Sequence, residues 1–418
     1  MADDDTTVVA GQRWPDLPTP PLGDWAPHLR VCVILPARDC QEELDRTLAS
    51  LARQTYPAEL LEVLVVDDAS TPPLRLPAAR PAHTRTVRRE EVSSHGSGPA
   101  RHAGALATDA PVLLFLDADM VADRCHVEAH ARWHHVCDHA VVLGRKWFVD
   151  FAGVSAGEVL EATATGDLTG LLEGRRMRGH EWQEELIATQ DRLTRDRDDA
   201  FLAVVGASVS VRSDLYRRAG GFAAFGLRGI VDTEFGYRAY TAGGLLVPDD
   251  QAVAYHQGAR SFAVRGDEIK LQRTGLAANH LPIPLFRPGN RGRRWAVPQV
   301  GVVVDAGDTA PELVQVCVDS VLASDVTDLG VTVVHPEGGE PPSWLRDYFA
   351  HETRVAFTTT PPRSAFPSPV TAVVPAGLTV SADTVAAALT LLAEEGAGVV
   401  RTHPADTGGS GVEVWRTR

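Results

Sequence analysis

Short apolar runs that stop abruptly at polar residues are the clearest pattern in the first third of the chain. They are VCVIL at 31–35, LEVLVV at 61–66 and VLLFL at 112–116. Runs of this length, rich in β-branched and aliphatic residues, predict buried strands. Between the first two runs, leucines at helical spacing predict an amphipathic helix over 41–54. The order strand, helix, strand predicts an α/β fold with a mostly parallel sheet and flanking helices.

Polar side chains follow each of the three predicted strands. Because the carboxyl ends of parallel strands meet at one edge of an open sheet, where ligands gather, we expect these side chains to form a binding site. They are Arg38, Asp39, Asp67, Asp68, Asp117 and Asp119. Roles in turns and helix caps are the alternative, above all for Asp39, which lies just before the predicted helix.

The rest of the chain divides by composition. Residues 1–29 are rich in Pro and Asp and predict a loose N-terminal arm, and residues 30–281 form the main domain. Within that domain, residues 155–200 carry many charges and predict helices and a mobile loop over an acceptor site. Residues 282–298 hold four prolines and predict a linker. A smaller α/β domain is expected over 299–418.

This smaller domain repeats the pattern of the first in a weaker form. Apolar runs at 300–304, 331–334 and 370–374 have a similar spacing, and a helix is predicted over 383–395. The third run precedes Pro-Ala-Gly at 375–377, where the first domain has Asp-Ala-Asp. These features predict a degenerate internal repeat that has lost its metal carboxylates. An unrelated small α/β domain is the alternative.

The net charge of the chain limits the kinds of molecule that it is expected to bind. The 418 residues carry a formal net charge of −15, and the pI is about 5.4, which argues against nucleic acid or an anionic membrane surface as the main partner. No apolar run approaches the roughly 20 residues that span a bilayer, and the acidic start does not resemble a signal peptide. The five cysteines form no CxxC pair, so neither a disulfide framework nor a zinc ribbon is expected. We expect a cytoplasmic protein without a transmembrane segment.

The triplet Asp117-Ala118-Asp119 gives the strongest chemical indication because it ends a predicted buried strand. Two carboxylates would repel a diphosphate unless a cation lay between them. Mn²⁺ and Mg²⁺ prefer oxygen ligands and complete their coordination with phosphate oxygens and water. Such an ion would stabilise the charge that develops on a departing diphosphate.

Four blocks of sequence resemble family 2 glycosyltransferases of the GT-A fold. They are VCVILPARDCQEELDRTLASLARQTYPAELLEVLVVDDAS, GPARHAGALATDAPVLLFLDADM, VVGASVSVRSDLYRRAGGF and VDTEFGYRAYTAGG. The resemblance covers about residues 30–258, in the family's order and spacing. It implies transfer of a sugar from a nucleotide-diphosphate donor, by family habit a UDP-sugar, to an acceptor hydroxyl by an inverting single displacement. The acceptor is open among a glycan, a lipid carrier, a peptide and a secondary metabolite.

The resemblance also implies roles for individual residues. The residues matching the donor-binding positions are Pro36, Ala37, Arg38, Asp39, Asp67, Asp68, Arg101, Asp117 and Ala118. Those matching metal ligands are Asp117, Asp119 and His256. The acidic motif that supplies the catalytic base matches Asp232 and Glu234.

Some of these roles have structural alternatives. The commonest acidic motif has two adjacent acids, but here Val231 precedes Asp232, so Asp232 is the favoured base and Glu234 its competitor. Glu234 is alternatively the structural partner of a nearby arginine. His256 is either a metal ligand, a phosphate contact or a structural residue.

Other short motifs indicate structure rather than chemistry. His126, His130 and His134 share one helical face. Because no acid completes an HExxH pattern among them, we expect a solvated helix face and not a metal site. The pair Gly220-Gly221 is expected to form a tight turn.

Competing functions lack their own signatures. A nicotinamide dehydrogenase would need GxGxxG after its first strand, where this chain has Pro-Ala-Arg-Asp. The glycine-rich basic loop of sugar-nucleotide pyrophosphorylases is also absent, and Arg294-Trp295 lacks the glutamine of the QxxRW motif of processive synthases. The remaining alternative is a catalytically inactive nucleotide-sugar or carbohydrate-binding scaffold protein. The presence of Asp117, Asp119 and Asp232 argues against it.

Overall fold

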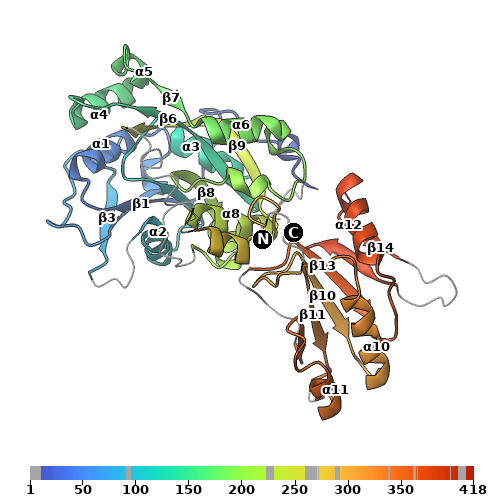
Figure 1. Ribbon diagram of the computed structural model, residues 1–418. Coiled ribbons are helices and arrows are strands. Elements are labelled where there is room, and N and C mark those ends of the chain that lie inside the picture. The colour runs from blue at the N-terminus through green and yellow to red at the C-terminus, as the bar shows by residue number, and fades with distance from the viewer. Residues whose placement is uncertain are drawn as a thin grey trace. The chain divides into compact units, whose positions relative to one another are not determined.

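The computed structural model separates into two compact units, Met1–Arg273 and Thr274–Arg418, each built on its own sheet (Figure 1). The residues it describes are 11–90, 96–222, 230–258, 271, 273–287, 292–337, 339–360, 364, 366–395, 397–402 and 411–418. The five cysteines are free, as expected. Among the described residues, no helix is long and apolar enough to cross a membrane.

The described part of unit 1 contains a nine-stranded sheet with the order β3-β2-β1-β4-β8-β6-β9-β5, and β7 pairs with β6. The strands are β1 (Val31–Ala37), β2 (Leu61–Asp67), β3 (His83–Arg88), β4 (Val112–Leu116), β5 (Met120–Ala122), β6 (Ala140–Val149), β7 (Arg178–Gly179), β8 (Ser208–Arg212) and β9 (Leu245–Gln257). Strands β3, β2, β1 and β4 are parallel, and so are β6 and β9. Strand β8 runs antiparallel to both β4 and β6. The expected α/β fold is therefore confirmed, and the three predicted strands are its parallel centre.

Helices cover both faces of this sheet. They are α1 (Gln41–Leu51), α2 (Ser97–Leu106), α3 (His126–His134), α4 (Ala156–Thr165), α5 (Leu168–Leu171), α6 (Glu181–Thr189), α7 (Ser213–Arg218) and α8 (Val231–Thr241). On one face, alternate β1 residues such as Val33 pack in a buried cluster with Leu48 of α1. On the other face, α2 lies so close that a Cβ on Gly104 would collide with Ile34. Burial on both faces explains why these strands are continuous apolar runs.

The segment 11–29, expected to be a loose arm, packs against the rest of unit 1. The Gln12 side chain accepts a hydrogen bond from the Leu246 backbone N–H at 2.8 Å. The Trp25 indole N–H donates to the Glu128 carboxylate at 2.9 Å. The segment therefore departs from the expectation because its large side chains gain partners in the core.

Helix α3 is buried on every side, so the expected solvated histidine face is wrong. His126, His130 and His134 are at most 1% exposed. Both ring nitrogens of His130 lie near hydroxyls of β8, with Nδ1 2.9 Å from Ser210 and Nε2 3.1 Å from Ser208. Spacing showed that the histidines share a face, but it could not show that serines of β8 would cover that face. No group of three metal-ligating side chains gathers among the described residues.

Unit 2 repeats the strand order of unit 1. Its elements are β10 (Val300–Asp305), α10 (Pro311–Leu322), β11 (Leu329–Val334), α11 (Ser343–Tyr348), β12 (Val355–Thr358), β13 (Val370–Pro375), α12 (Thr384–Glu394), β14 (Val399–Arg401) and β15 (Glu413–Arg416). The order β12-β11-β10-β13-β15-β14 has three parallel pairings followed by two antiparallel ones, like β3-β2-β1-β4-β8-β6. This agreement supports our proposal that unit 2 is a degenerate copy of unit 1.

The buried histidines generate a pH prediction. Burial lowers the pKa of His126 to about 4, that of His134 to about 3, and that of His130 well below its usual value. Unfolded histidines titrate near pH 6.5, so the unfolded chain binds more protons than the folded one between about pH 4 and pH 6.5. Stability should therefore fall as pH drops through this window, by about 1.4 kcal/mol per pH unit for each histidine.

Urea unfolding at pH 7.0, 6.0 and 5.0 measures this slope. In the variant His130→Gln, which keeps a polar side chain beside both serines, the slope should decrease by about one histidine's share. An unchanged slope in this variant would show that His130 is not held neutral in the folded protein.

Candidate active site

The Asp117-Ala118-Asp119 triplet lies where β4, β8 and β9 meet. The backbone N–H of Asp117 donates to the Ala207 carbonyl at 3.2 Å, just before β8. The carbonyl of Asp119 accepts from the backbone N–H of Gln257, at the end of β9, at 2.9 Å. The carbonyl of Ala118 accepts from the Thr47 hydroxyl of α1 at 2.8 Å. The backbone of the triplet is thus fixed by three separate elements.

Arg101 joins two of the predicted acids. Its guanidinium donates to Asp117 Oδ1 at 2.6 Å and to Asp232 Oδ1 at 2.7 Å. Arg101 is 2% exposed, whereas the Asp117 and Asp232 side chains are 29% and 27% exposed. Burial alone would lower the pKa of Arg101, but the two carboxylates outweigh it and raise that pKa. The guanidinium is therefore a charged link between the two acids, and the donor contact expected for Arg101 would need this link to rearrange.

A glycine makes room for this ion-pair network. A Cβ on Gly206 would collide with both the Arg101 guanidinium and Asp232 Oδ1. The residue was inside a quoted sequence block, but nothing in its spacing marked it as the contact point. A larger residue at this position would displace the link between Arg101 and Asp232.

The two candidate bases have different surroundings. Asp232 is in the first turn of α8 with part of its side chain exposed. Glu234 is 0% exposed, and its Oε2 accepts from Arg238 Nε at 2.7 Å. Arg238 also donates to the carbonyls of Ala219 and Gly221. These contacts favour the structural alternative for Glu234 and leave Asp232 as the accessible acid of the motif.

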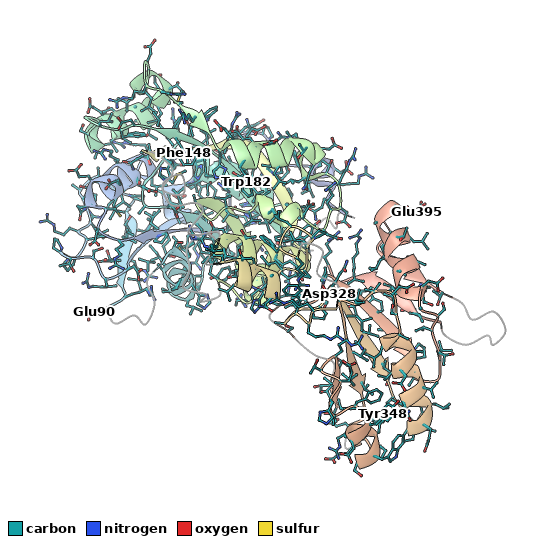
Figure 2. The ribbon with its side chains drawn as sticks, in the orientation of Figure 1. Glu90, Phe148, Trp182, Asp328, Tyr348 and Glu395 are labelled. Carbon is teal, nitrogen blue, oxygen red and sulfur yellow. The ribbon has the colours of Figure 1, made fainter. Side chains whose placement is uncertain are left out.

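Asp119 and His256 form the second half of the candidate site. Asp119 Oδ2 lies 3.4 Å from His256 Nε2, and the His256 ring packs against Phe148 with centroids 4.9 Å apart (Phe148 is labelled in Figure 2). Asp119 Oδ1 and His256 Nδ1 are buried and have no hydrogen-bond partner among the described residues. Burial and the Asp117 charge raise the pKa of Asp119 to about 6, against the lowering effect of His256. Two neighbouring side chains that each keep one buried polar atom without a partner, an oxygen on Asp119 and a nitrogen on His256, offer ligand types that a divalent cation accepts.

The two acids at the end of β2, which match donor-binding positions in the resemblance, are held by protein groups. Asp67 accepts from the backbone N–H groups of Ser70 at 2.9 Å and Leu74 at 3.2 Å and pairs with Arg88 at 2.5 Å. Burial alone would raise the pKa of Asp67, but the hydrogen bonds from Ser70 and Leu74 and the Arg88 charge lower it overall. Asp68 pairs with Arg89 and accepts from the backbone N–H of Gly96 at 2.9 Å. Its bond to Gly96 ties β2 to the start of the helix that carries Arg101.

The loop after β1 lies beside this pair. The Ala37 carbonyl accepts from the Asp68 backbone N–H at 2.9 Å. Asp39 does not cap α1, whose N-cap is Cys40 without a side-chain hydrogen bond. Its carboxylate instead accepts from the backbone N–H of Thr71 at 2.9 Å. Pro36 is half-buried and Arg38 is exposed.

A hollow of about 750 Å³ lies elsewhere, where β2 and β3 begin. Its charged side chains pair with one another, Arg30 with Asp109 at 2.9 Å and Arg85 with Glu62 at 3.1 Å. We place the candidate site at the opposite edge of the sheet because the unpartnered and partly exposed acids converge there.

The two acids of α8 should differ in their effect on stability. Glu234→Gln leaves the buried Arg238 guanidinium without its charged partner and should cost about 3 kcal/mol or more. Asp232→Asn should cost about 1 kcal/mol, because Asp232 is partly exposed and Arg101 keeps Asp117. Denaturant unfolding of both variants measures the difference, and equal losses would contradict the structural role of Glu234.

Comparison with known proteins gives an independent indication of family. Residues 32–169 match the family described as Glycosyl transferase family 2. Two validoxylamine A glucosyltransferases, from Streptomyces hygroscopicus subsp. limoneus and from subsp. jinggangensis (strain 5008), are each 36% identical over 100 residues, which is 23% of this chain. The match spans 22% and 24% of those relatives, less than a quarter of their length.

Solved structures with similarity to the chain include two transferase complexes. A mannosyltransferase from Pyrobaculum calidifontis with GDP-Man and Mn²⁺ is 17% identical, with a TM-score of 0.39, covering 64% of this chain and 67% of its own. S. aureus TarS 1–349 with UDP-GlcNAc is 18% identical, with a TM-score of 0.42, covering 60% of this chain and 66% of its own. The family match therefore concerns residues 32–169, which lie within unit 1 and resemble glycosyl transferase family 2.

Proposed function

We propose that the protein is a glycosyltransferase that moves a sugar from a nucleotide-diphosphate donor to an acceptor hydroxyl with inversion. The observation that carries this proposal is the network in which Arg101 links Asp117 to Asp232, next to the Asp119–His256 pair. It brings a candidate base and candidate metal ligands from β4, α8 and β9 to one sheet edge. The family match over residues 32–169 supports the same class of reaction.

The donor side is proposed from the strand ends. The loop at Pro36–Asp39 and the acids Asp67 and Asp68 would contact the nucleotide. The family resemblance favours UDP as that nucleotide. Both acids already accept hydrogen bonds from the protein. They would therefore mainly fix the shape of the loops around the nucleotide. The relatives' printed names make glucose the first sugar to test and validoxylamine A the first acceptor.

A divalent cation, Mn²⁺ or Mg²⁺, fits the unpartnered atoms described above. Asp119 and His256 would hold it. Asp117 would join as a further ligand only after leaving Arg101, because the three side chains do not gather as a group among the described residues. When bound, such an ion neutralises negative charge on a departing nucleotide diphosphate. The chain's own contribution is a backbone held at Asp117 and Asp119 by β8 and β9, so the carboxylates start in fixed positions.

Asp232 is proposed as the general base. Its carboxylate would take the proton of the acceptor hydroxyl as that oxygen bonds to the anomeric carbon and the bond to the nucleotide diphosphate breaks. Arg101 holds Oδ1 of Asp232 and so orients the carboxylate. The free cysteines are compatible with our proposal of a reducing, cytoplasmic location.

The metal proposal is tested by a donor screen. Purified full-length protein is mixed with UDP-, GDP- and TDP-sugars, Mn²⁺ and validoxylamine A, and released nucleotide is measured. We expect turnover with a UDP-sugar that falls at least about 100-fold in EDTA or in Asp119→Ala, because the leaving diphosphate loses its counter-charge.

Asp109→Asn, at the opposite edge of the sheet, is the matched control and should retain turnover. Undiminished turnover in EDTA would contradict the metal assignment. Binding of UDP-sugars without turnover of any donor would favour the inactive scaffold instead.

The base assignment is tested by Asp232→Asn, which keeps the shape of the side chain. Transfer to the acceptor should fall by about 10²- to 10⁴-fold, because the proton has no acceptor. Calorimetric affinity for UDP with Mn²⁺ should change by less than about threefold. Retention of wild-type kcat in this variant would remove Asp232 from the mechanism.

A further inference from the structure

Four ring side chains form a continuous row from the Asp119–His256 pair to the surface of unit 1. The centroid distances are 4.9 Å from His256 to Phe148, 5.7 Å from Phe148 to His180 and 5.8 Å from His180 to Trp182. Phe148 and Trp182 are both labelled in Figure 2. We call these four residues the aromatic row.

The sheet fixes the order of the row. Phe148 of β6 is the parallel partner of His256 of β9, so both side chains emerge on the same face. On its other side, Phe148 pairs with Arg178 of β7. His180 follows β7 directly and is the N-cap of α6, where its ring accepts from the Gln183 backbone N–H. Trp182 is then in the first turn of α6. The row is therefore held by two strand pairings and a helix start.

The exposure of the row changes along its length. Phe148 is half-buried and His180 is 5% exposed, whereas Trp182 is 44% exposed. A single exposed apolar side chain is ordinary. Trp182, however, is the outer end of a packed row whose inner end touches a candidate metal ligand. A ligand stacked on Trp182 would contact the outer end of this row.

Acidic residues are near this exposed ring in the sequence of α6. Glu181 precedes Trp182, Glu185 follows about one helical turn later, and both are exposed. His180 lines a hollow of about 270 Å³, together with Lys146, Gln183 and Glu184, whereas Trp182 is not among its lining residues. Oε1 of Glu184 accepts no hydrogen bond among the described residues but lies 3.7 Å from Arg145 Nε in an ion pair. An aromatic face bordered by hydrogen-bonding groups suits a ligand that is apolar on its ring faces and polar at its rim.

We propose that Trp182 is the outer part of an acceptor subsite and that it stacks on a saturated, hydroxylated six-membered ring, as found in sugars. This inference rests on the proposed function, whose acceptor class it names. The C–H groups on one face of such a ring contact the indole, and its hydroxyls reach the carboxylates at the rim. The reacting ring of a longer acceptor then lies nearer to Asp232.

The test compares Trp182→Ala and Trp182→Phe with Trp344→Ala, which removes a 40% exposed tryptophan from α11 in unit 2. Transfer to methyl α-D-glucoside and to myo-inositol is measured, with acyclic glycerol as the reference acceptor. We expect Trp182→Ala to raise the KM for both ring acceptors at least tenfold with kcat within threefold. Trp182→Phe should restore most of the affinity, and the KM for glycerol and for the donor should change less than twofold.

Equal KM values in Trp182→Ala and Trp344→Ala, or an equal loss for glycerol, would overturn the subsite. Saturation-transfer NMR with methyl α-D-glucoside separates this result from failure of the proposed function, because it needs no turnover. Ring signals that disappear in Trp182→Ala and persist in Trp344→Ala support the subsite even if no donor is consumed. Signals that persist in both variants reject it.

Discussion

The buried guanidinium of Arg101 is the constraint on which the rest of the candidate site depends. It holds carboxylates from the end of β4 and the start of α8 at 2.6 and 2.7 Å. Two acids drawn so close without a cation would repel, and one would be driven to bind a proton. The arginine must therefore reach this position from α2, and two glycines permit it. A Cβ on Gly98 would collide with Val231, and one on Gly206 would collide with the ion pair itself.

Much of the parallel sheet could be predicted because its strands are buried on both faces. Strands β1, β2 and β4 appear in the sequence as continuous apolar runs. Because parallel strands run in the same direction, the acids that follow them are expected at one edge of the sheet. Strand β8 was not identified as a strand, because SVSVR alternates valine with serine and resembles a surface segment. Its serines instead face the buried histidines of α3. A hydrophobic pattern shows which face of a strand or helix is apolar and which is polar. It does not show that two polar faces will pack against each other inside the protein.

The pairings within the site were harder to predict than its location. Arg101 and Asp232 are 131 positions apart, so no local spacing indicates their contact. Glu234 and Arg238 are four positions apart on α8, and that spacing did allow a structural interpretation beside the catalytic one. Unit 2 shows that strand topology and site chemistry are determined by different residues. It has the same strand order, yet Pro375 and Gly377 stand at the end of β13, where unit 1 has Asp117 and Asp119 after β4. The apolar pattern is sufficient for the topology, and the chemistry depends on a few residues at the strand ends.

The candidate acids therefore fall into three groups that differ in the charged and polar partners of their carboxylates. Asp67 and Asp68 are held by backbone N–H groups and arginines, which makes them part of the wall. Asp117 and Asp232 share one arginine and remain partly exposed. Asp119 has a buried oxygen without a hydrogen-bond partner among the described residues, and its neighbour His256 has a ring nitrogen in the same condition. Because an unpartnered buried carboxylate oxygen is costly, a cation entering this edge of the sheet gains most at Asp119. In the proposed function, the inner end of the aromatic row would lie beside that ion, and Asp232, oriented by Arg101, would face the acceptor.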